Sequence, residues 1–357
     1  MAMRIHKGRG APANPAGRFE LQEHEAADDG WGSLELLAED PSPRTEVLPD
    51  ASRTVIARND SPDIGFDRSI NPYRGCEHGC VYCYARPSHA YLGLSSGLDF
   101  ETKLFAKHDA AALLRRELAR PGYRAATMAL GTNTDPYQPI ERRLAITRSV
   151  LEVLLEAHHP FAITTKSASV VRDLDILTAA GRQGLCRVDI SVTTLDGALA
   201  RLLEPRASTP ALRLEAVRRL AAAGVPVGVN VAPVIPGLTD HEIERILEAA
   251  ATAGAGGAGW ILLRLPFEVK ELFEAWLAEH RPLRARHVLS LLRQCREGRL
   301  NDPAFGSRMR GSGPIAALIR QRFERALARH GLDRPRRWSL RTDLFRPPSP
   351  GGQLDLF

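Results

Sequence analysis

The sequence predicts an α/β protein whose core is a full or partial (β/α) barrel. Two observations support this class. Apolar, β-branched runs alternate with amphipathic stretches from about residue 67 to 265, and turn residues separate them. Hydrophobic residues make up 44% of the chain, which is enough to bury a sizeable core. Strands that alternate with helices form parallel sheets, and such barrels bind ligands at the carboxyl ends of their strands. A doubly wound open sheet is the alternative architecture.

Five strands and four helices are predicted within this region. The strands are 126–131, 161–165, 187–193, 225–231 and 260–265, and the helices lie near 142–157, 171–180, 210–223 and 239–253. Thr209 is expected to cap the third helix, with Pro210 at its first position and Gly224 past its end. Thr239 and Glu242 predict a capping box at the start of the fourth.

Four segments are predicted from these patterns. Residues 1–60 are rich in glycine, proline and charged residues, so we expect a mostly disordered arm. Residues 61–266 form the barrel core. Residues 267–346 form a helical extension, with helices near 268–279, 284–296 and 314–330. Residues 347–357 form a flexible tail behind a Pro/Gly-rich stretch.

Composition narrows the class of protein. The chain has 357 residues and a net charge of +6, which permits a polyanionic partner without requiring one. No apolar stretch follows the first basic residues, and no run is long and apolar enough to cross a bilayer. The five cysteines are an odd number, and three are tightly grouped. We therefore expect a cytoplasmic protein whose cysteines bind a metal or cluster rather than form disulfides.

The grouped cysteines are Cys76, Cys80 and Cys83. Soft thiolates at such short spacing suit an iron–sulfur cluster or zinc. A four-iron cluster usually takes four cysteines, so three would leave one iron open to a further ligand. The alternative is a closed zinc site completed by His78. Cys186 and Cys295 are expected to be small buried hydrophobic residues.

The Cys-x3-Cys-x2-Cys spacing, with Tyr82 before the third cysteine, resembles the signature loop of radical S-adenosylmethionine enzymes. The loop precedes the β/α series, as in that family, and Tyr82-Cys83-Tyr84 is similar to the spore-photolyase-like branch. The resemblance implies a [4Fe-4S] cluster whose open iron binds S-adenosylmethionine, and an external electron donor. It implies cleavage of that cofactor to methionine and a 5′-deoxyadenosyl radical, which takes hydrogen from a substrate. It also implies that Tyr82 contacts adenine and that Tyr84 assists radical transfer.

One departure limits the resemblance. Spore photolyase uses an additional cysteine as hydrogen donor near the end of the strand that here finishes at Gly131. This sequence has Thr132, Asn133 and Thr134 instead. The resemblance therefore extends to the cofactor chemistry and not to repair of the spore thymine lesion.

Three polar residues follow the predicted strand 126–131. Thr134, Asp135 and Glu141 could bind the cofactor's ammonium group, and the resemblance places the methionyl amino group at the end of this strand. Small and hydroxylated residues also let backbone groups approach a ligand. An ordinary βα turn, with Asp135 as a turn residue, is the alternative.

Later strand ends supply three more candidates. Lys166 follows the strand 161–165 and could bind a carboxylate or a phosphate; a solvated lysine is the alternative. Ser191 lies on an interior strand near the ribose contact that the resemblance implies, although a hydroxyl bonded to backbone is equally consistent. Arg206, or its neighbour Glu204, could reach the cofactor's ribose or carboxylate, and a helix-entry ion pair is the alternative.

Two segments suggest partners. The last five residues, Gln353, Leu354, Asp355, Leu356 and Phe357, resemble the bacterial sliding-clamp-binding motif, in which the apolar residues fill a pocket. Folding back onto the chain's own apolar surface is the alternative. Arg308 and Arg310 lie among small residues and could bind phosphates, or form a solvated basic loop. We therefore expect a radical enzyme whose substrate the sequence does not identify, with DNA repair or modification as the reaction that these segments suggest; the competing hypothesis is a zinc-stabilised module that binds nucleic acid or protein without radical chemistry.

Overall fold

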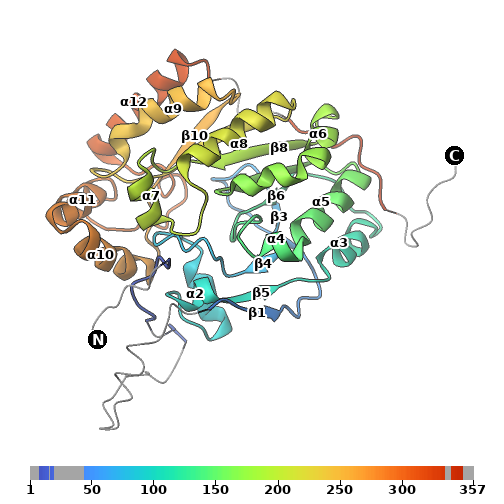
Figure 1. Ribbon diagram of the computed structural model, residues 1–357, viewed down its shortest axis with the longest axis horizontal. Helices are drawn as coiled ribbons and strands as arrows, with labels where there is room; N and C mark the ends of the chain where they lie inside the picture. The colour runs from blue at the N-terminus through green and yellow to red at the C-terminus, as the bar shows by residue number, and fades with distance from the viewer. Residues whose placement is uncertain (1–7, 16, 20–43, 334–338, 349–357) are drawn as a thin grey trace, which may run out of the picture.

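The computed structural model describes residues 8–15, 17–19, 44–333 and 339–348. Its centre is a seven-stranded sheet in the order β10-β9-β8-β7-β6-β3-β2 (Figure 1). The strands are β2 (Ile56–Arg58), β3 (Arg68–Ile70), β6 (Met128–Leu130), β7 (Phe161–Thr165), β8 (Cys186–Ser191), β9 (Val227–Val234) and β10 (Ala258–Leu262). All neighbours pair in parallel except β2, which runs antiparallel to β3. In the described part of the chain the end strands do not pair with each other, so the predicted barrel is confirmed as a partial one.

Helices cover the outer face of this curved sheet, as Figure 1 shows for α5, α6 and α8. The helices of the barrel are η1 (Arg86–Leu92), α2 (Asp99–Thr102), α3 (Ala110–Leu118), α4 (Glu141–Leu144), α5 (Ile146–Glu156), η2 (Ala168–Asp173), α6 (Leu174–Arg182), α7 (Gly197–Leu203), α8 (Pro210–Ala222), η3 (Asp240–Glu242) and α9 (Ile243–Thr252). Buried aliphatic residues from the strands and from the inner faces of these helices form one continuous core.

The predicted helix ends were right in one case and wrong in the other. Thr209 caps α8 by accepting a hydrogen bond from Leu212 N at 3.4 Å, and Pro210 occupies the first turn. The predicted capping box of Thr239 and Glu242 does not form. The hydroxyl of Thr239 accepts from Ile235 N instead, and Glu242 accepts from Leu195 N. A turn contact four residues away and a contact distant in sequence have therefore replaced the predicted pairing.

Part of the segment predicted to be disordered is ordered. Strand β1 (Glu46–Pro49) lies beside β5 (Lys103–Ala106), which also pairs with β4 (Tyr73–Arg74) in a second, three-stranded sheet. Strand β2 also falls within residues 1–60. The prediction failed there because composition does not reveal backbone pairing between segments far apart in sequence. Residues 20–43 lie outside the described residues.

Three helices follow the sheet: α10 (Val269–His280), α11 (Pro282–Gln294) and α12 (Gly313–Arg329). Trp276 of α10 donates its indole N–H to Leu202 O of α7 at 3.1 Å, which fixes the helix against the barrel. Further along, Arg346 N donates to Ala157 O at 2.9 Å, and the ring of Phe345 packs against Tyr123. None of the helices in the described ranges is long and apolar enough to cross a membrane. The peptide at 353–357 lies outside the described residues.

Candidate functional site

The cysteine loop follows β4 and turns through two glycines in the left-handed region. Gly75 has φ +76° and Gly79 has φ +67°, which other residue types adopt only with strain. A Cβ at Gly79 would lie 2.7 Å from Glu101 Oε2, and one at Gly75 would lie 2.9 Å from Phe100 O. Glycine at these two positions is therefore what lets the loop fold tightly around its three cysteines.

The thiols of Cys76, Cys80 and Cys83 lie close together at the carboxyl end of the sheet. Cys76 and Cys80 are buried and Cys83 is partly covered. Burial raises the pKa of all three thiols. For Cys76, the carboxylate of Asp135 and the other two thiols raise the pKa further. Metal ligation would convert these thiols to thiolates, since a bound metal displaces the proton of its thiol ligand.

Side chains from other elements hold the loop in place. Gln138 is fully buried; its amide donates to Gly75 O at 3.2 Å, and its carbonyl accepts from Glu77 N at 2.8 Å. Arg206 pairs with Glu77 across 3.0 Å. Arg86, also fully buried, donates to Cys80 O at 2.9 Å. The loop is therefore fixed by long-range contacts before any metal is considered.

A strap formed by residues 8–15 crosses the outside of this loop. Gly10 N and Ala11 N both donate to the buried carboxylate of Glu101, at 2.9 and 2.8 Å. The strap fits closely, because a Cβ at Gly10 would lie 1.6 Å from Gly79 O. The segment predicted to be disordered thus contributes part of the wall around the cysteines.

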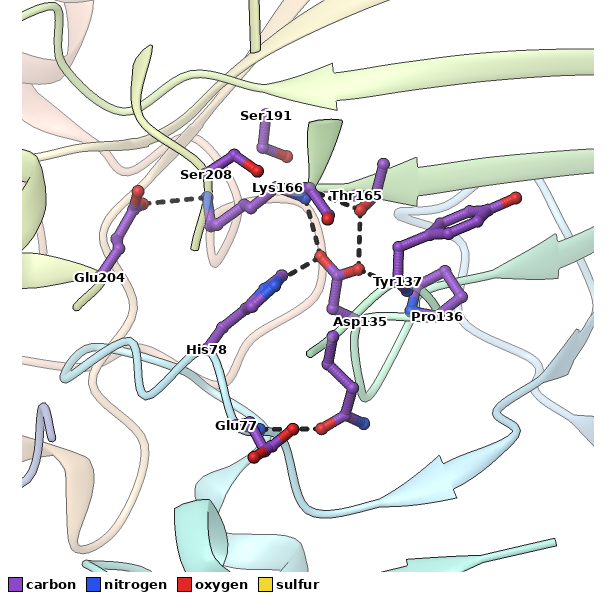
Figure 2. A network of polar contacts seen from close by, with 12 residues as sticks. Glu77, His78, Asp135, Pro136, Tyr137, Thr165, Lys166, Ser191, Glu204 and Ser208 are labelled. Atoms are coloured by element: carbon purple, nitrogen blue, oxygen red, sulfur yellow. Dashed lines mark hydrogen bonds and ion pairs between the residues drawn. The ribbon is translucent and has the colours of Figure 1, made fainter. Parts of the chain in front are cut away.

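Asp135, which follows β6, is the centre of a hydrogen-bond network (Figure 2). Its carboxylate accepts from Thr165 Oγ1 at 2.7 Å, from Tyr137 N at 2.9 Å and from Lys166 N at 2.7 Å, and it faces His78 Nδ1 at 3.3 Å. Burial alone would raise the pKa of Asp135, but the His78 ring and these hydrogen bonds hold it below its usual value. His78 therefore links the cysteine loop to the end of β6.

Lys166 and Glu204 form a second, more deeply buried network. Lys166 Nζ donates to Ala232 O at 2.8 Å and lies 3.3 Å from Glu204 Oε1. Glu204 also accepts from Thr193 Oγ1 at 2.6 Å, from the guanidinium of Arg213 and from the hydroxyl of Tyr82. Burial would raise the pKa of Glu204, but Arg213 and Lys166 together lower it far below its ordinary range.

The two tyrosines beside Cys83 occupy different environments. Tyr82 is buried, and the ammonium of Lys166 lies 5.7 Å from the centre of its ring. Tyr84 is 47% exposed and donates its hydroxyl proton to Thr132 O at the end of β6. The ring of Tyr84 is thus the more accessible of the two.

The remaining predicted residues are spread more widely. Ser191 is buried at the end of β8, and Figure 2 shows it beside Lys166. Thr134 donates to Tyr73 O at 3.0 Å. Glu141 is bonded to Tyr73 and to Arg172 at 2.8 Å, in a separate buried cluster at the start of α4. The structure thus brings Asp135, Lys166, Ser191 and Tyr82 together and leaves Glu141 apart.

Sequence reasoning missed the roles of Gln138 and Arg213 and considered Glu204 only as an alternative to Arg206. Gln138 lies between the predicted site residues Asp135 and Glu141, so its position after β6 was a usable signal. Arg213 gave no local signal, because the sequence of an amphipathic helix does not show whether one of its arginines is buried or faces solvent.

The donor set fits a four-iron cluster. Among the described residues, no three histidine, cysteine, aspartate or glutamate side chains are grouped closely enough to hold one metal ion. A four-iron cluster does not require such convergence, because each thiolate binds a different iron. Three grouped thiols, two buried and one partly covered, with no disulfide between them supply the ligands such a cluster needs.

Comparisons with known proteins agree with this geometry. An uncharacterized protein of Mycobacterium bovis is 41% identical over 219 residues, which cover 61% of this chain and 64% of that protein. An uncharacterized protein of Methanocaldococcus jannaschii is 25% identical over 173 residues, covering 48% of this chain and 62% of that protein. Both matches span less than two thirds of the relative's own length.

Solved structures show the same fold. A spore photoproduct lyase variant superposes with a TM-score of 0.59 at 17% identity, over 80% of this chain and 79% of that one. Another variant, with bound AdoMet and dinucleoside spore photoproduct, gives a TM-score of 0.56 at 17% identity, over 80% of this chain and 78% of the other. The family model of the Radical SAM superfamily matches residues 70–250, which run from the cysteine loop through α9. With that match and a partial barrel that carries its three thiols at the carboxyl ends of the strands, the chain belongs to the radical SAM superfamily.

Proposed function

We propose that this protein is an enzyme that binds a [4Fe-4S] cluster through Cys76, Cys80 and Cys83 and uses S-adenosylmethionine to start radical chemistry. The observation that carries the proposal is the position of the three thiols, two buried and one partly covered, against the Asp135 and Lys166 networks at the strand ends. When bound, the cluster and its cofactor supply an electron and a 5′-deoxyadenosyl radical. An external electron donor is required.

The chain's own residues would bind and orient the cofactor. Asp135 offers a negative charge for the ammonium group, although His78 and three other donors already occupy its oxygens, so the ammonium would share Oδ2 with His78. Lys166 offers a positive charge for the carboxylate, and the hydroxyl of Ser191 lies beside it for the ribose. Tyr82 supplies an aromatic face for adenine.

The zinc-site alternative is weaker for a geometric reason. A closed zinc site needs His78 as its fourth ligand. Such a site also needs its ligands to converge on a single ion, and among the described residues no three histidine, cysteine, aspartate or glutamate side chains are grouped closely enough to do so.

The direct test is anaerobic reconstitution with iron and sulfide, followed by incubation with a reductant and S-adenosylmethionine. We expect a brown protein with about four irons and four sulfides per chain that forms 5′-deoxyadenosine. Cys186→Ala is the matched control, because Cys186 is buried on β8 with its thiol directed to Leu177 O. A colourless protein that binds one zinc ion would refute the proposal.

We also propose that the chemistry acts near DNA, as repair or modification. The support is the basic charge of the chain and the clamp-like peptide from Gln353 to Phe357. A sliding clamp that held this peptide would place the enzyme on DNA without the barrel reading any sequence. A titration with a purified sliding clamp, comparing the full chain with one truncated after Gly352, tests this link.

A further inference from the structure

Two arginines near the carboxyl end of β10, one buried and one partly buried, have no carboxylate partner among the described residues. Arg296, which follows α11, is 1% exposed; its Nη2 donates to Leu263 O at 2.6 Å and to Arg308 O at 3.1 Å. Its Nε and Nη1 have no partner among the described residues. Arg264 Nη1 contacts Met309 Sδ at 3.7 Å, and its buried Nε likewise has no partner there. Both guanidinium groups therefore lie where the chain that follows β10 meets residues 308 and 309.

The nearest carboxylates are already bonded elsewhere. Asp63 accepts from Arg308 Nε and from Gly306 N at 2.7 Å. Asp302 accepts from Ala304 N at 2.9 Å and from the hydroxyl of Ser307. Asp63 thus neutralises Arg308, whereas the part of the chain that the structure describes offers no ion pair to Arg264 or Arg296.

This arrangement is electrostatically unfavourable on its own. Burial lowers the pKa of Arg264, and the nearby charge of Arg308 lowers it further. Burial and the charge of Arg264 lower the pKa of Arg296 to about 10. Buried donors without acceptors and like charges side by side both destabilise a fold unless a ligand or water offsets them. A bound anion would offset both at once.

The two arginines lie next to the cysteine loop. The guanidinium of Arg264 is 5.5 Å from the centre of the Tyr84 ring, and Tyr84 directly follows Cys83. Because Tyr84 is about half exposed, a ligand can approach Arg264 from solvent at the point where a substrate would meet the cofactor. Arg296 lies behind it and adds its charge to the same position.

We propose that Arg264, supported by Arg296, binds a phosphate monoester group of the substrate beside Tyr84. The inference rests on the proposed function, because it places the substrate at the radical site. Within DNA a phosphate monoester occurs only at a strand end, so a DNA substrate would be bound by its terminal phosphate. Two uncompensated positive charges match a dianion better than a carboxylate or a phosphodiester, each of which carries one negative charge. The forked guanidinium also suits the geometry of phosphate oxygens.

The test uses the reconstituted full chain and inorganic phosphate as the probe, at a pH where phosphate is a dianion. Affinity is measured by calorimetry and by the rise in melting temperature, at ionic strength matched with sodium chloride. Arg264→Gln should weaken phosphate binding about ten- to a hundredfold. Without phosphate, Arg264→Gln should melt no lower than wild type, because it removes one of two like charges. Arg264→Lys, which keeps the charge but not the fork, should lie between the two and serves if Arg264→Gln does not fold.

Arg322→Gln is the matched control, because Arg322 pairs with Glu244 on the outer helices at 2.7 Å. It should leave phosphate binding unchanged. Equal phosphate affinity in wild type and Arg264→Gln would overturn the proposal. Acetate or dimethyl phosphate binding as tightly as phosphate would overturn the dianion assignment, and displacement of phosphate by S-adenosylmethionine would assign Arg264 to the cofactor instead. Formation of 5′-deoxyadenosine is measured separately, so a failure of the proposed function is distinguishable.

Discussion

The two sides of the site differ in whether their charged side chains have partners. On the side of β6 to β8, the charged groups lie in closed networks: Asp135 faces His78, and Glu204 holds Lys166 and Arg213. On the side of β10, Arg264 and the arginine behind it carry donors without acceptors. Both sides flank the same cysteine loop.

This difference distinguishes side chains whose positions are fixed by their partners from side chains that remain available to a ligand. A closed network fixes the position of its groups, and such preorganisation suits a cofactor that is the same in every turnover. Unpaired buried charge destabilises the protein alone and is offset only when a ligand arrives. We interpret the first side as the cofactor side and the second as the substrate side, and the predictions below test this division.

The largest effect should come from removing a thiol of the cysteine loop, which both sides of the site flank. Replacing Cys76, Cys80 or Cys83 with alanine should abolish cluster assembly and cofactor cleavage, because each thiolate binds its own iron. Iron and sulfide analysis, the visible absorption band and 5′-deoxyadenosine formation measure this. His78→Ala should retain its iron. Loss of metal in that variant, together with an intact cluster in one cysteine variant, would contradict the assignment.

The next largest effect should come from breaking the closed network around Glu204. Glu204→Gln removes the buried charge that pairs with Arg213 and Lys166, which leaves two cations without a partner. We expect a loss of about 3–5 kcal/mol in the free energy of unfolding, measured by denaturant titration. The matched control is Glu215→Gln, which should change the free energy of unfolding far less, because the pair of Glu215 with Arg218 is exposed and screened by solvent.

The same pair of variants tests the pH dependence of stability. Burial opposes ionisation of Glu204, but Arg213 and Lys166 lower its folded pKa far below its ordinary value. The stabilisation is therefore fully present above about pH 5 and is lost as the pH falls toward the lowered folded pKa. The difference between wild type and Glu204→Gln should shrink below that pH. A difference that stayed constant down to the acid transition would refute this account.

The sequence was informative where a local rule determines structure. Strand β7 matches the predicted range 161–165, and α8 begins at Pro210 as its cap predicts. The short spacing of Cys76, Cys80 and Cys83 placed all three in one loop, as the structure has them, and their role as cluster ligands stays a prediction. Helices α10 to α12 also fall near their predicted ranges.

Long-range contacts were not predictable from the sequence. Strand β3 has only three residues, too few for a periodic pattern. Gly10 lies in an arm of disordered composition, yet fits against Gly79. The unpaired state of Arg264 and Arg296 depends on where Asp63 and Asp302 find their partners, which no local pattern encodes.

A smaller effect is expected from variants that keep the cluster but weaken cofactor binding on one side of the site. Asp135→Ala and Lys166→Ala should weaken S-adenosylmethionine binding about ten- to a hundredfold while iron content stays at the wild-type level. Arg264→Gln should leave S-adenosylmethionine affinity unchanged, since it lies on the substrate side. Calorimetry on the reconstituted protein measures all three. Wild-type affinity in both Asp135→Ala and Lys166→Ala would reduce these residues to structural roles.

The smallest effect on the site should come from the tail. Arg346 is bonded to Ala157, which precedes β7, so the chain there lies at the amino-terminal edge of the strands, opposite the cysteine loop. Truncation after Gly352 should therefore leave cofactor cleavage unchanged. It should abolish binding to a purified bacterial sliding clamp, because Leu356 and Phe357 would fill the apolar pocket and contribute about 1.5–3 kcal/mol each. Ordering the tail offsets part of this gain, so we expect micromolar affinity for the full chain. Equal binding by both chains, or by neither, would remove the link to DNA while leaving both sides of the site as they are.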